Sequence, residues 1–217
     1  MTDSQLLKKD MFGEIRRISA GGEQHIVRDS GGASRWVRWL ARRLLRGEAS
    51  ALAALADLDG TPELLQIERS RLIRSYLRGA PMQVAKPHEP AYFKAAARLL
   101  RQMHQLDVVH NDLAKEPNLL VRDDGSPAFI DFQLAWFSPQ RGRLFRLLAY
   151  EDLRHLLKHK RTYCPQHLTR RELAILADPS FPSRAFRWTF KPVYMFVTRR
   201  LLGWSDREGA ADRGDRS

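Results

Sequence analysis

Three oxygen-bearing side chains lie close together near the middle of the sequence. Asp112 and Asn118 stand in VVHNDLAKEPN, and Asp131 stands in FIDFQ beyond the turn-forming RDDG. If NLLV and AFID pair as an antiparallel hairpin, Asn118 and Asp131 meet at one end, with Asp112 in the loop that enters that end. Such oxygen ligands suit Mg²⁺, which usually shares its coordination with substrate phosphates and water. A carboxylate beside the metal can accept a hydroxyl proton.

A purely structural role is the alternative for each of these residues. A single Asp in a turn more often caps a helix or forms an Asx-turn than binds a ligand. Three such residues in this order, each next to a predicted strand or helix end, are harder to obtain by chance. The combination therefore favours a metal and phosphate site.

The order HND, then N, then IDF resembles the catalytic core of the protein-kinase-like superfamily, in which H-R-D…N and D-F-G hold the base and the metals. This variant is similar to the small bacterial kinases of the RIO, lipopolysaccharide (Kdo) and aminoglycoside phosphotransferase types. The resemblance spans roughly residues 12–157. It implies that Asp112 is the catalytic base, that Asn118 and Asp131 hold Mg²⁺, and that His110 supports the loop.

The motif departs from the common pattern at three points. Asn111 replaces the usual Arg, and Gln133 stands where the Gly of D-F-G would be. The loop from Asp112 to Asn118 carries one extra residue, and Pro117 is placed to shape it. Lys115, within this loop, could approach the transferred phosphate.

Kinases also hold the nucleotide phosphates with a Lys on a strand that pairs with a Glu on the following helix. The candidates here are Arg28, in the predicted strand QHIVRD, and Glu48, in the Arg-rich helix RLLRGEASALAAL. Arg keeps the charge and can bind phosphate through two nitrogens, but its shape differs from that of Lys. Glu48 could equally be a solvated acid that relieves the positive charge of its helix.

The glycine-rich loop of a kinase is reduced here to Gly21 and Gly22 in ISAGGEQ. Two adjacent glycines more often form a simple hairpin turn, although such a turn can also cover phosphates. Downstream, Asp152 matches by position an acid that anchors the catalytic loop in related kinases. An acid at a helix N-terminus would explain Asp152 nearly as well.

Period-two and helical patterns predict the elements that must position these residues. Strands are expected at 12–19, 24–29, 63–68 and 71–77, and helices at 34–58, with Ser34 as the N-cap, and at 90–106. A hairpin and a mainly helical remainder follow. The predicted fold class is α+β: a two-lobed, protein-kinase-like fold with a small antiparallel N-lobe sheet, one helix, and a reduced, mainly helical C-lobe.

The whole chain is expected to form a single kinase-like domain. The N-lobe would span about residues 10–79 and the C-lobe about residues 82–204, and a polar tail would cover 205–217. The chain is long enough for one domain with a full core or for two small lobes that share a cleft.

The net charge of +12 is concentrated in two segments, 35–46 and 184–200, which interleave arginines with aromatic residues and contain no acid. Aromatic-basic segments suit an anionic membrane surface, while basic faces also suit RNA. No RNA-binding motif accompanies the charge, so the membrane surface is favoured. Aromatic residues packed in a core beneath solvated charges would explain the pattern without any partner.

The sequence contains one cysteine, Cys164, no apolar N-terminal signal and no apolar run of membrane-spanning length. The expected location is the cytoplasm, with peripheral attachment to the inner face of the membrane as an extension of the charge argument. The expected activity is ATP- and Mg²⁺-dependent phosphorylation of a hydroxyl on a protein Ser/Thr or on a lipopolysaccharide-core sugar. The alternative is a catalytically weak pseudokinase that acts as a nucleotide-binding or scaffold protein.

Overall fold

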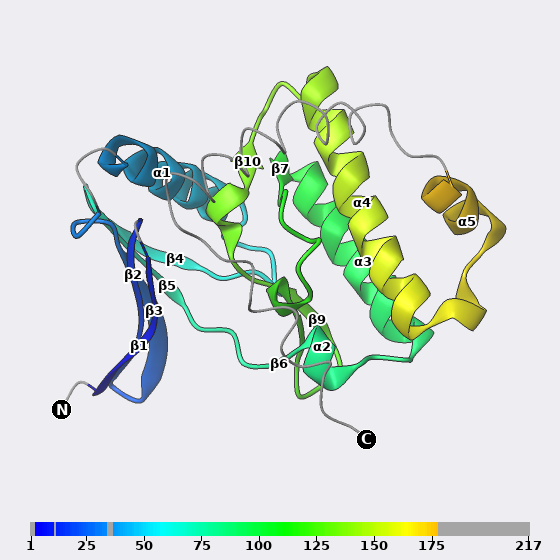
Figure 1. Ribbon diagram of the computed structural model, residues 1–217, viewed down its shortest axis with the longest axis horizontal. Coiled ribbons are helices and arrows are strands. Elements are labelled where there is room, and N and C mark those ends of the chain that lie inside the picture. Colours follow the sequence, from blue (N-terminus) through cyan, green and yellow to red (C-terminus); the bar gives the residue numbers. More distant parts are fainter. Residues whose placement is uncertain (1–2, 11, 34–36, 178–217) are drawn as a thin grey trace. The chain divides into compact units, whose positions relative to one another are not determined.

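The computed structural model describes residues 3–10, 12–33 and 37–177 of the chain. These residues form an α+β fold in which an antiparallel N-terminal sheet and one helix are followed by a mainly helical C-terminal part (Figure 1). The predicted α+β class is confirmed. No described helix is long and apolar enough to cross a membrane.

Five antiparallel strands form the N-terminal sheet, in the order β1-β2-β3-β5-β4. Their bounds are β1 Asp3–Asp10, β2 Gly13–Ala20, β3 Glu23–Asp29, β4 Leu64–Ile67 and β5 Arg71–Ser75. The centre of the sheet is apolar, since Ile26 and Val27 of β3 and Leu72 of β5 are buried. Burial of such side chains stabilises the fold by about 1.5–3 kcal/mol each.

Helix α1 (Arg38–Ala54) packs against β4 and β5 on one side and against the segment that follows Asp131 on the other. Its buried face follows a helical period through Leu45, Ala49 and Leu52. The helix thus joins the sheet to the part of the chain that carries the candidate site.

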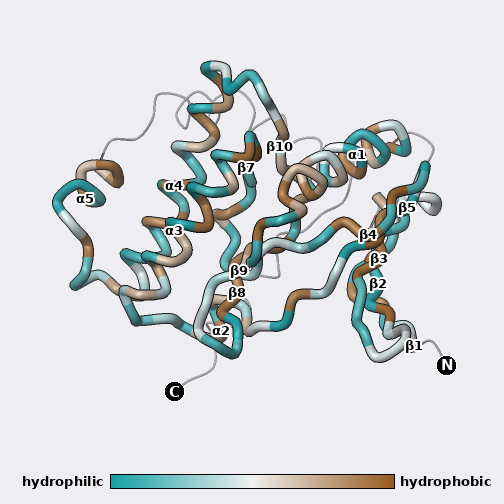
Figure 2. The backbone as a smooth tube through the Cα atoms, turned by 180° about the vertical axis from the view of Figure 1, so that it is seen from behind, coloured by the Kyte–Doolittle hydropathy of each residue, from teal (hydrophilic) through white to brown (hydrophobic). Residues whose placement is uncertain are grey.

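The C-terminal part begins with two short elements and a long helix. Their bounds are β6 Ala80–Pro81, α2 Met82–Ala85 and α3 Pro90–Gln105. Helix α3 starts with Pro at its first position, where the ring is pre-organised for a helix, and buries one face against α4. Hydrophobic and hydrophilic residues alternate along α3 and α4 (Figure 2).

Short strands and 3₁₀ turns then build the candidate site. Their bounds are β7 Val108–Val109, η1 Glu116–Asn118, β8 Leu119–Val121, β9 Pro127–Phe129, η2 Phe132–Leu134 and β10 Trp136–Phe137. Strands β8 and β9 form the expected hairpin, to which β6 adds, and β10 pairs with β7.

Two helices and a connecting turn complete the described chain: α4 Arg143–Tyr163, η3 Pro165–His167 and α5 Arg170–Ala177. One hydrophobic core runs through these layers and includes Leu52 of α1, Leu100 of α3, Phe129 of β9 and Leu156 of α4. The hairpin that carries Asn118 and Asp131 is therefore built on the same core as α1.

The predicted strands at 12–19, 24–29, 63–68 and 71–77 are confirmed, as are the helix at 90–106 and the central hairpin. Strand β1 was not predicted from its charged sequence. The helix predicted at 34–58 ends earlier than expected, at Ala54, and Trp39 near its start is 73% exposed. Trp39 therefore lies on the exposed face of α1.

Some sequence-based expectations fall outside the described residues. These are the N-cap role of Ser34, the aromatic-basic segment 184–200 and the polar tail from Ser205.

Candidate active site

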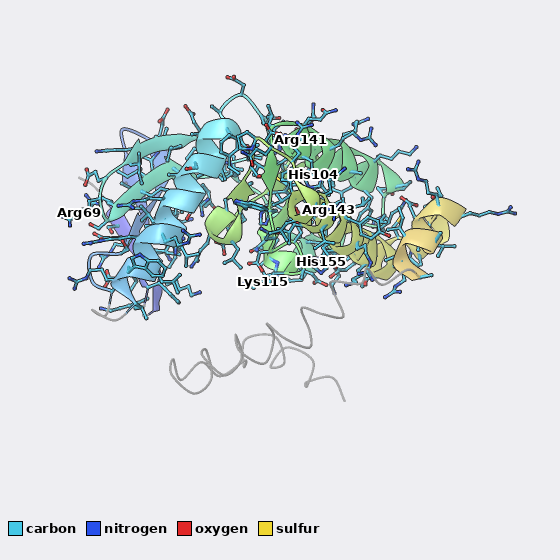
Figure 3. All side chains as sticks on the ribbon, turned by 90° about the horizontal axis from the view of Figure 1, so that it is seen from above. Arg69, His104, Lys115, Arg141, Arg143 and His155 are labelled. Atoms are coloured by element: carbon cyan, nitrogen blue, oxygen red, sulfur yellow. The ribbon has the colours of Figure 1, made fainter. Side chains whose placement is uncertain are left out.

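Asp112, Lys115 and Asn118 meet in the loop between β7 and β8. The Lys115 Nζ lies 2.8 Å from Oδ2 of Asp112, and the amide nitrogen of Asn118 donates to the same oxygen at 3.0 Å. The Asn118 amide also donates to the backbone carbonyl of Asp112 at 2.9 Å. Asp112 and Asn118 are buried. Lys115, labelled in Figure 3, is exposed. One carboxylate oxygen is thus held by an amide from inside and by a cation at the surface.

The loop is held from behind by helix α4. The His159 imidazole lies 2.8 Å from the carbonyl of Leu113, and the Tyr163 hydroxyl donates to the Glu116 carboxylate at 2.7 Å. Burial, helped by the hydrogen bond to Glu116, raises the pKa of Tyr163 to about 12. The tyrosine therefore keeps its proton at neutral pH and remains a donor. Pro117 lies in the first turn of η1, where it shapes the longer loop.

Asp131 follows β9 at the end of the hairpin where Asn118 precedes β8. The backbone amide of Ile130 donates to the carbonyl of Asn118 at 3.0 Å, so the two chain segments are adjacent. Asp131 has a left-handed backbone with φ of 63°, a conformation that Asp tolerates better than most residues. Such conformations persist where the surroundings require them, and they cluster at functional sites.

The side-chain oxygen atoms of Asn118 and Asp131 are of the type that Mg²⁺ prefers as ligands. The Asn118 nitrogen is engaged with Asp112, which leaves its amide oxygen for a ligand, and the Asp131 carboxylate has no hydrogen bond or ion pair to a described residue. Within the described ranges, no group of three or more His, Cys, Asp or Glu residues could hold a metal. A site of one carboxylate and one amide suits Mg²⁺ better than Zn²⁺, because Mg²⁺ completes its shell with phosphates and water.

His110 lies beneath the loop, fully buried. Its Nε2 lies 3.0 Å from the carbonyl of Ile130, and its Nδ1 lies 3.3 Å from the backbone amide of Asp112. These contacts are both satisfied by a neutral ring that donates from Nε2 and accepts at Nδ1. Burial lowers the pKa of His110 against the opposing pull of Asp152 and Asp112. The ring, which also packs on Phe132, joins the two halves of the site.

Asp152 of α4 anchors the start of the loop. Its carboxylate accepts hydrogen bonds from the backbone amides of His110 at 2.7 Å and Asn111 at 2.9 Å. Nε2 of His104 lies 3.3 Å from the same carboxylate. Asp152 lies well inside α4, not in its first turn, so the helix-terminus explanation does not hold. The anchoring contact expected from the resemblance is present.

Arg28 and Glu48 form a buried ion pair between β3 and α1, with 2.7 Å between Nη1 and Oε2. Arg74 of β5 approaches the other Glu48 oxygen at 3.4 Å. Glu48 is 1% exposed, so the alternative of a solvated helix residue is wrong. Sequence reasoning missed Arg74, whose place beside Glu48 depends on the pairing of β5 with β3.

The structure does not bring Gly21 and Gly22 close to Arg28. The two glycines form the β2–β3 turn with φ of 61° and 86°, typical of a tight hairpin, and Ala20 pairs with Glu23 beside them. Arg28 lies near the opposite end of β3, about 20 Å away at strand spacing. The β1–β2 turn lies at the Arg28 end, because Gly13 follows it and Glu14 pairs with Asp29.

Gly13 was missed at the sequence level because β1 was not recognised. Its φ is 128°, and a Cβ at this position would stand 1.9 Å from the carbonyl oxygen of Asp29. Only glycine allows the start of β2 to approach the end of β3 so closely.

The sequence matches no known family model and no curated protein. Its structure is similar to the Rio2 kinase from Chaetomium thermophilum, with a TM-score of 0.62, 15% identity, and 78% of this chain and 59% of that chain covered. It is also similar to the Rio2 kinase–ADP/Mg²⁺–phosphoaspartate complex from the same organism. There the TM-score is 0.58 and the identity 17%, with 78% and 57% of the two chains covered.

The chain thus spans less than two thirds of the length of the solved structures it resembles. The likeness shows a protein-kinase-like fold that resembles the RIO kinases.

Proposed function

We propose that this protein is an ATP- and Mg²⁺-dependent phosphotransferase that phosphorylates a hydroxyl group. The observation that carries the proposal is the Asp112 carboxylate, held by Asn118 and Lys115 at the end of the hairpin that also presents Asp131. In a kinase-like fold, this is where base, metal ligands and transferred phosphate meet.

Asp112 is the proposed base, and Lys115 the proposed contact to the phosphate. The acceptor oxygen would attack the γ-phosphorus while its proton passes to Asp112, and the bond between γ-phosphorus and the bridging oxygen would break to release ADP. Lys115 now pairs with Asp112 through a flexible, exposed side chain. It can turn toward a phosphate group while Asn118 continues to orient the base.

Asn118 and Asp131 are the proposed Mg²⁺ ligands. The metal would supply charge neutralisation for the nucleotide phosphates. The two residues come from opposite strands of one hairpin, whose register keeps them at the same end.

Arg28, positioned by Glu48, is the proposed contact to the nucleotide phosphates. Only one nitrogen of the Arg28 guanidinium donates to Glu48, so its other donors can face phosphate oxygens. Arg74 approaches the other oxygen of the same carboxylate. The backbone that would cover the nucleotide phosphates is proposed to be the β1–β2 turn beside Gly13, at the same end of the sheet as Arg28. Gly21 and Gly22, at the opposite end of β3, are not proposed for this role.

The proposed acceptor is a protein Ser/Thr or a lipopolysaccharide-core sugar. A lipid-linked sugar would place the protein in the cytoplasm, peripheral to the inner face of the membrane. RNA is the less favoured partner, since no described element matches an RNA-binding motif.

ATP consumption with and without Mg²⁺ tests the activity. Asp112→Ala and Asp131→Ala are expected to reduce it by at least about 100-fold. Lys94→Ala, at an exposed position on α3, is the matched control and is expected to leave it unchanged. Equal ATP consumption by the wild type and the Asp131 variant would contradict the proposal.

A pseudokinase is the second candidate, favoured by Arg28 in place of Lys and by the close engagement of that Arg with a buried carboxylate. It predicts Mg²⁺-dependent binding of an ATP analogue, seen as a shift in melting temperature, without phosphoryl transfer. Turnover that requires Asp112 would rule it out.

A further inference from the structure

A basic groove of about 790 Å³ runs between helix α1 and the segment 133–137. One wall is α1 and the other is the end of η2 with strand β10, which lie side by side in Figure 1. The groove does not include Asp112, Asn118 or Asp131, so it is separate from the candidate active site.

Among the residues that the structure describes, no acidic residue lines the groove, whereas four arginines of α1 do: Arg38, Arg42, Arg43 and Arg46. Of these, the side chains of Arg42, Arg43 and Arg46 make no hydrogen bond or ion pair to any other described residue. The Nε atoms of Arg38 and Arg42 are shielded from solvent and lack an acceptor within the described part of the chain. A buried donor without an acceptor is costly, and the guanidinium groups that carry these atoms hold positive charge that an anionic ligand would neutralise.

Large apolar side chains are exposed around the same arginines. Trp39 of α1 is the most exposed of them, and across the groove Leu134, Trp136 and Phe137 are each between 37% and 39% exposed. Most of the large exposed side chains of α1, η2 and β10 thus gather here. The surface combines fixed positive charge with an apolar rim.

We propose that this α1–β10 groove is a docking site for the phosphate-bearing head groups of an anionic lipid surface. Arginines beside Trp and Leu side chains match the boundary between head groups and acyl chains, where charge meets phosphate and apolar groups enter the lipid. Single-stranded RNA could stack its bases on the aromatic rings. It has no apolar group to contact Leu134 or Leu40, which is also exposed on α1.

On each wall of the groove, a lining residue is close in sequence to a residue of the candidate active site. Gly47 lines the groove next to Glu48, and Gln133 lines it two residues after Asp131. Docking here would bring a lipid-linked acceptor toward the site, which is the only part of the inference that rests on the proposed function. The binding itself requires no turnover.

Co-sedimentation of the full chain with vesicles tests the docking. We expect binding to vesicles that contain phosphatidylglycerol and none to pure phosphatidylcholine vesicles. The double variant Arg42→Gln/Arg46→Gln should bind about 30-fold more weakly, because each surface arginine near an anionic membrane contributes about fivefold. Trp39→Ala should weaken binding through the loss of the apolar contact.

Arg98→Gln/Arg101→Gln on α3 is the matched control, since it removes the same charge from exposed helix positions outside the groove. It should bind vesicles like the wild type. Circular dichroism and the melting temperature verify that each variant is folded.

Unchanged vesicle binding by the Arg42/Arg46 variant, or an equal loss in the α3 control, would overturn the proposal. So would binding of single-stranded RNA that depends on the groove arginines when vesicles do not bind. Inhibition of vesicle binding by inorganic phosphate at low concentration would assign the groove to a free anion instead. None of these results depends on whether the protein consumes ATP.

Discussion

The carboxylate of Asp152 accepts a hydrogen bond from the backbone amide of His110 at 2.7 Å, although the two residues are 42 positions apart. The same carboxylate accepts the amide of Asn111, so helix α4 determines where the loop before Asp112 begins. Asn111 has a positive φ of 63°, a strained conformation for most side chains. The anchor therefore stabilises a backbone shape that the loop would not adopt alone.

Replacing Asp152 with Ala is expected to lower the free energy of unfolding by about 3 kcal/mol, because two buried backbone amides lose a charged acceptor. Asp152→Asn should cost less, since its one amide oxygen still accepts one of them. Chemical denaturation of both variants measures the difference. A loss below about 1 kcal/mol for the Ala variant would show that the loop keeps its conformation without the Asp152 carboxylate.

The Arg28–Glu48 pair predicts a second stability effect. Glu48→Gln should cost about 3–5 kcal/mol, because it leaves Arg28 and part of Arg74 buried without an anionic partner. Arg28→Met in the Glu48→Gln background should recover part of that loss. Urea denaturation of the single and double variants gives the coupling, and strictly additive losses would argue against a buried pair.

Gly13 and Gly21 form a matched test of the two turns in the sheet. Gly13→Ala is expected to destabilise the fold by at least about 3 kcal/mol, because the new Cβ would collide with the backbone carbonyl of Asp29. Gly21→Ala meets open space and should cost only about 1–2 kcal/mol for its left-handed backbone. Similar melting temperatures for the two variants would contradict the described β1–β2 turn.

His110 predicts how stability depends on pH. Its pKa is lowered by burial, so below the ordinary value of 6.5 the unfolded chain takes up a proton that the folded ring does not. The free energy of unfolding should fall as the pH drops below that value, by at most about 1.4 kcal/mol per pH unit for this residue. His155, whose pKa is also lowered by burial, adds a slope of the same sign.

His110→Gln can keep one donor and one acceptor but does not titrate. Urea denaturation between about pH 7 and pH 5 should give a shallower slope for this variant than for the wild type. An identical slope would mean that folding does not lower the pKa of His110.

The sequence by itself determined the local elements and the grouping of Asp112, Asn118 and Asp131. The alternation of β3, the helical period of α3 and the RDDG turn are short-range signals, and a hairpin places its two ends together whatever surrounds it. The protein-kinase-like fold class was implied by the resemblance of HND, N and IDF to the catalytic core of that superfamily.

Only the tertiary structure decided the features that depend on distant partners. Strand β1 has too little apolar alternation to be recognised and forms because β2 supplies its hydrogen bonds. Its presence places the β1–β2 turn, not Gly21 and Gly22, at the Arg28 end of the sheet. Three further features likewise arise from packing between segments far apart in sequence, which no local pattern encodes. They are the anchoring of His110 by Asp152, the approach of Arg74 as a second partner of Glu48, and the exposure of Trp39.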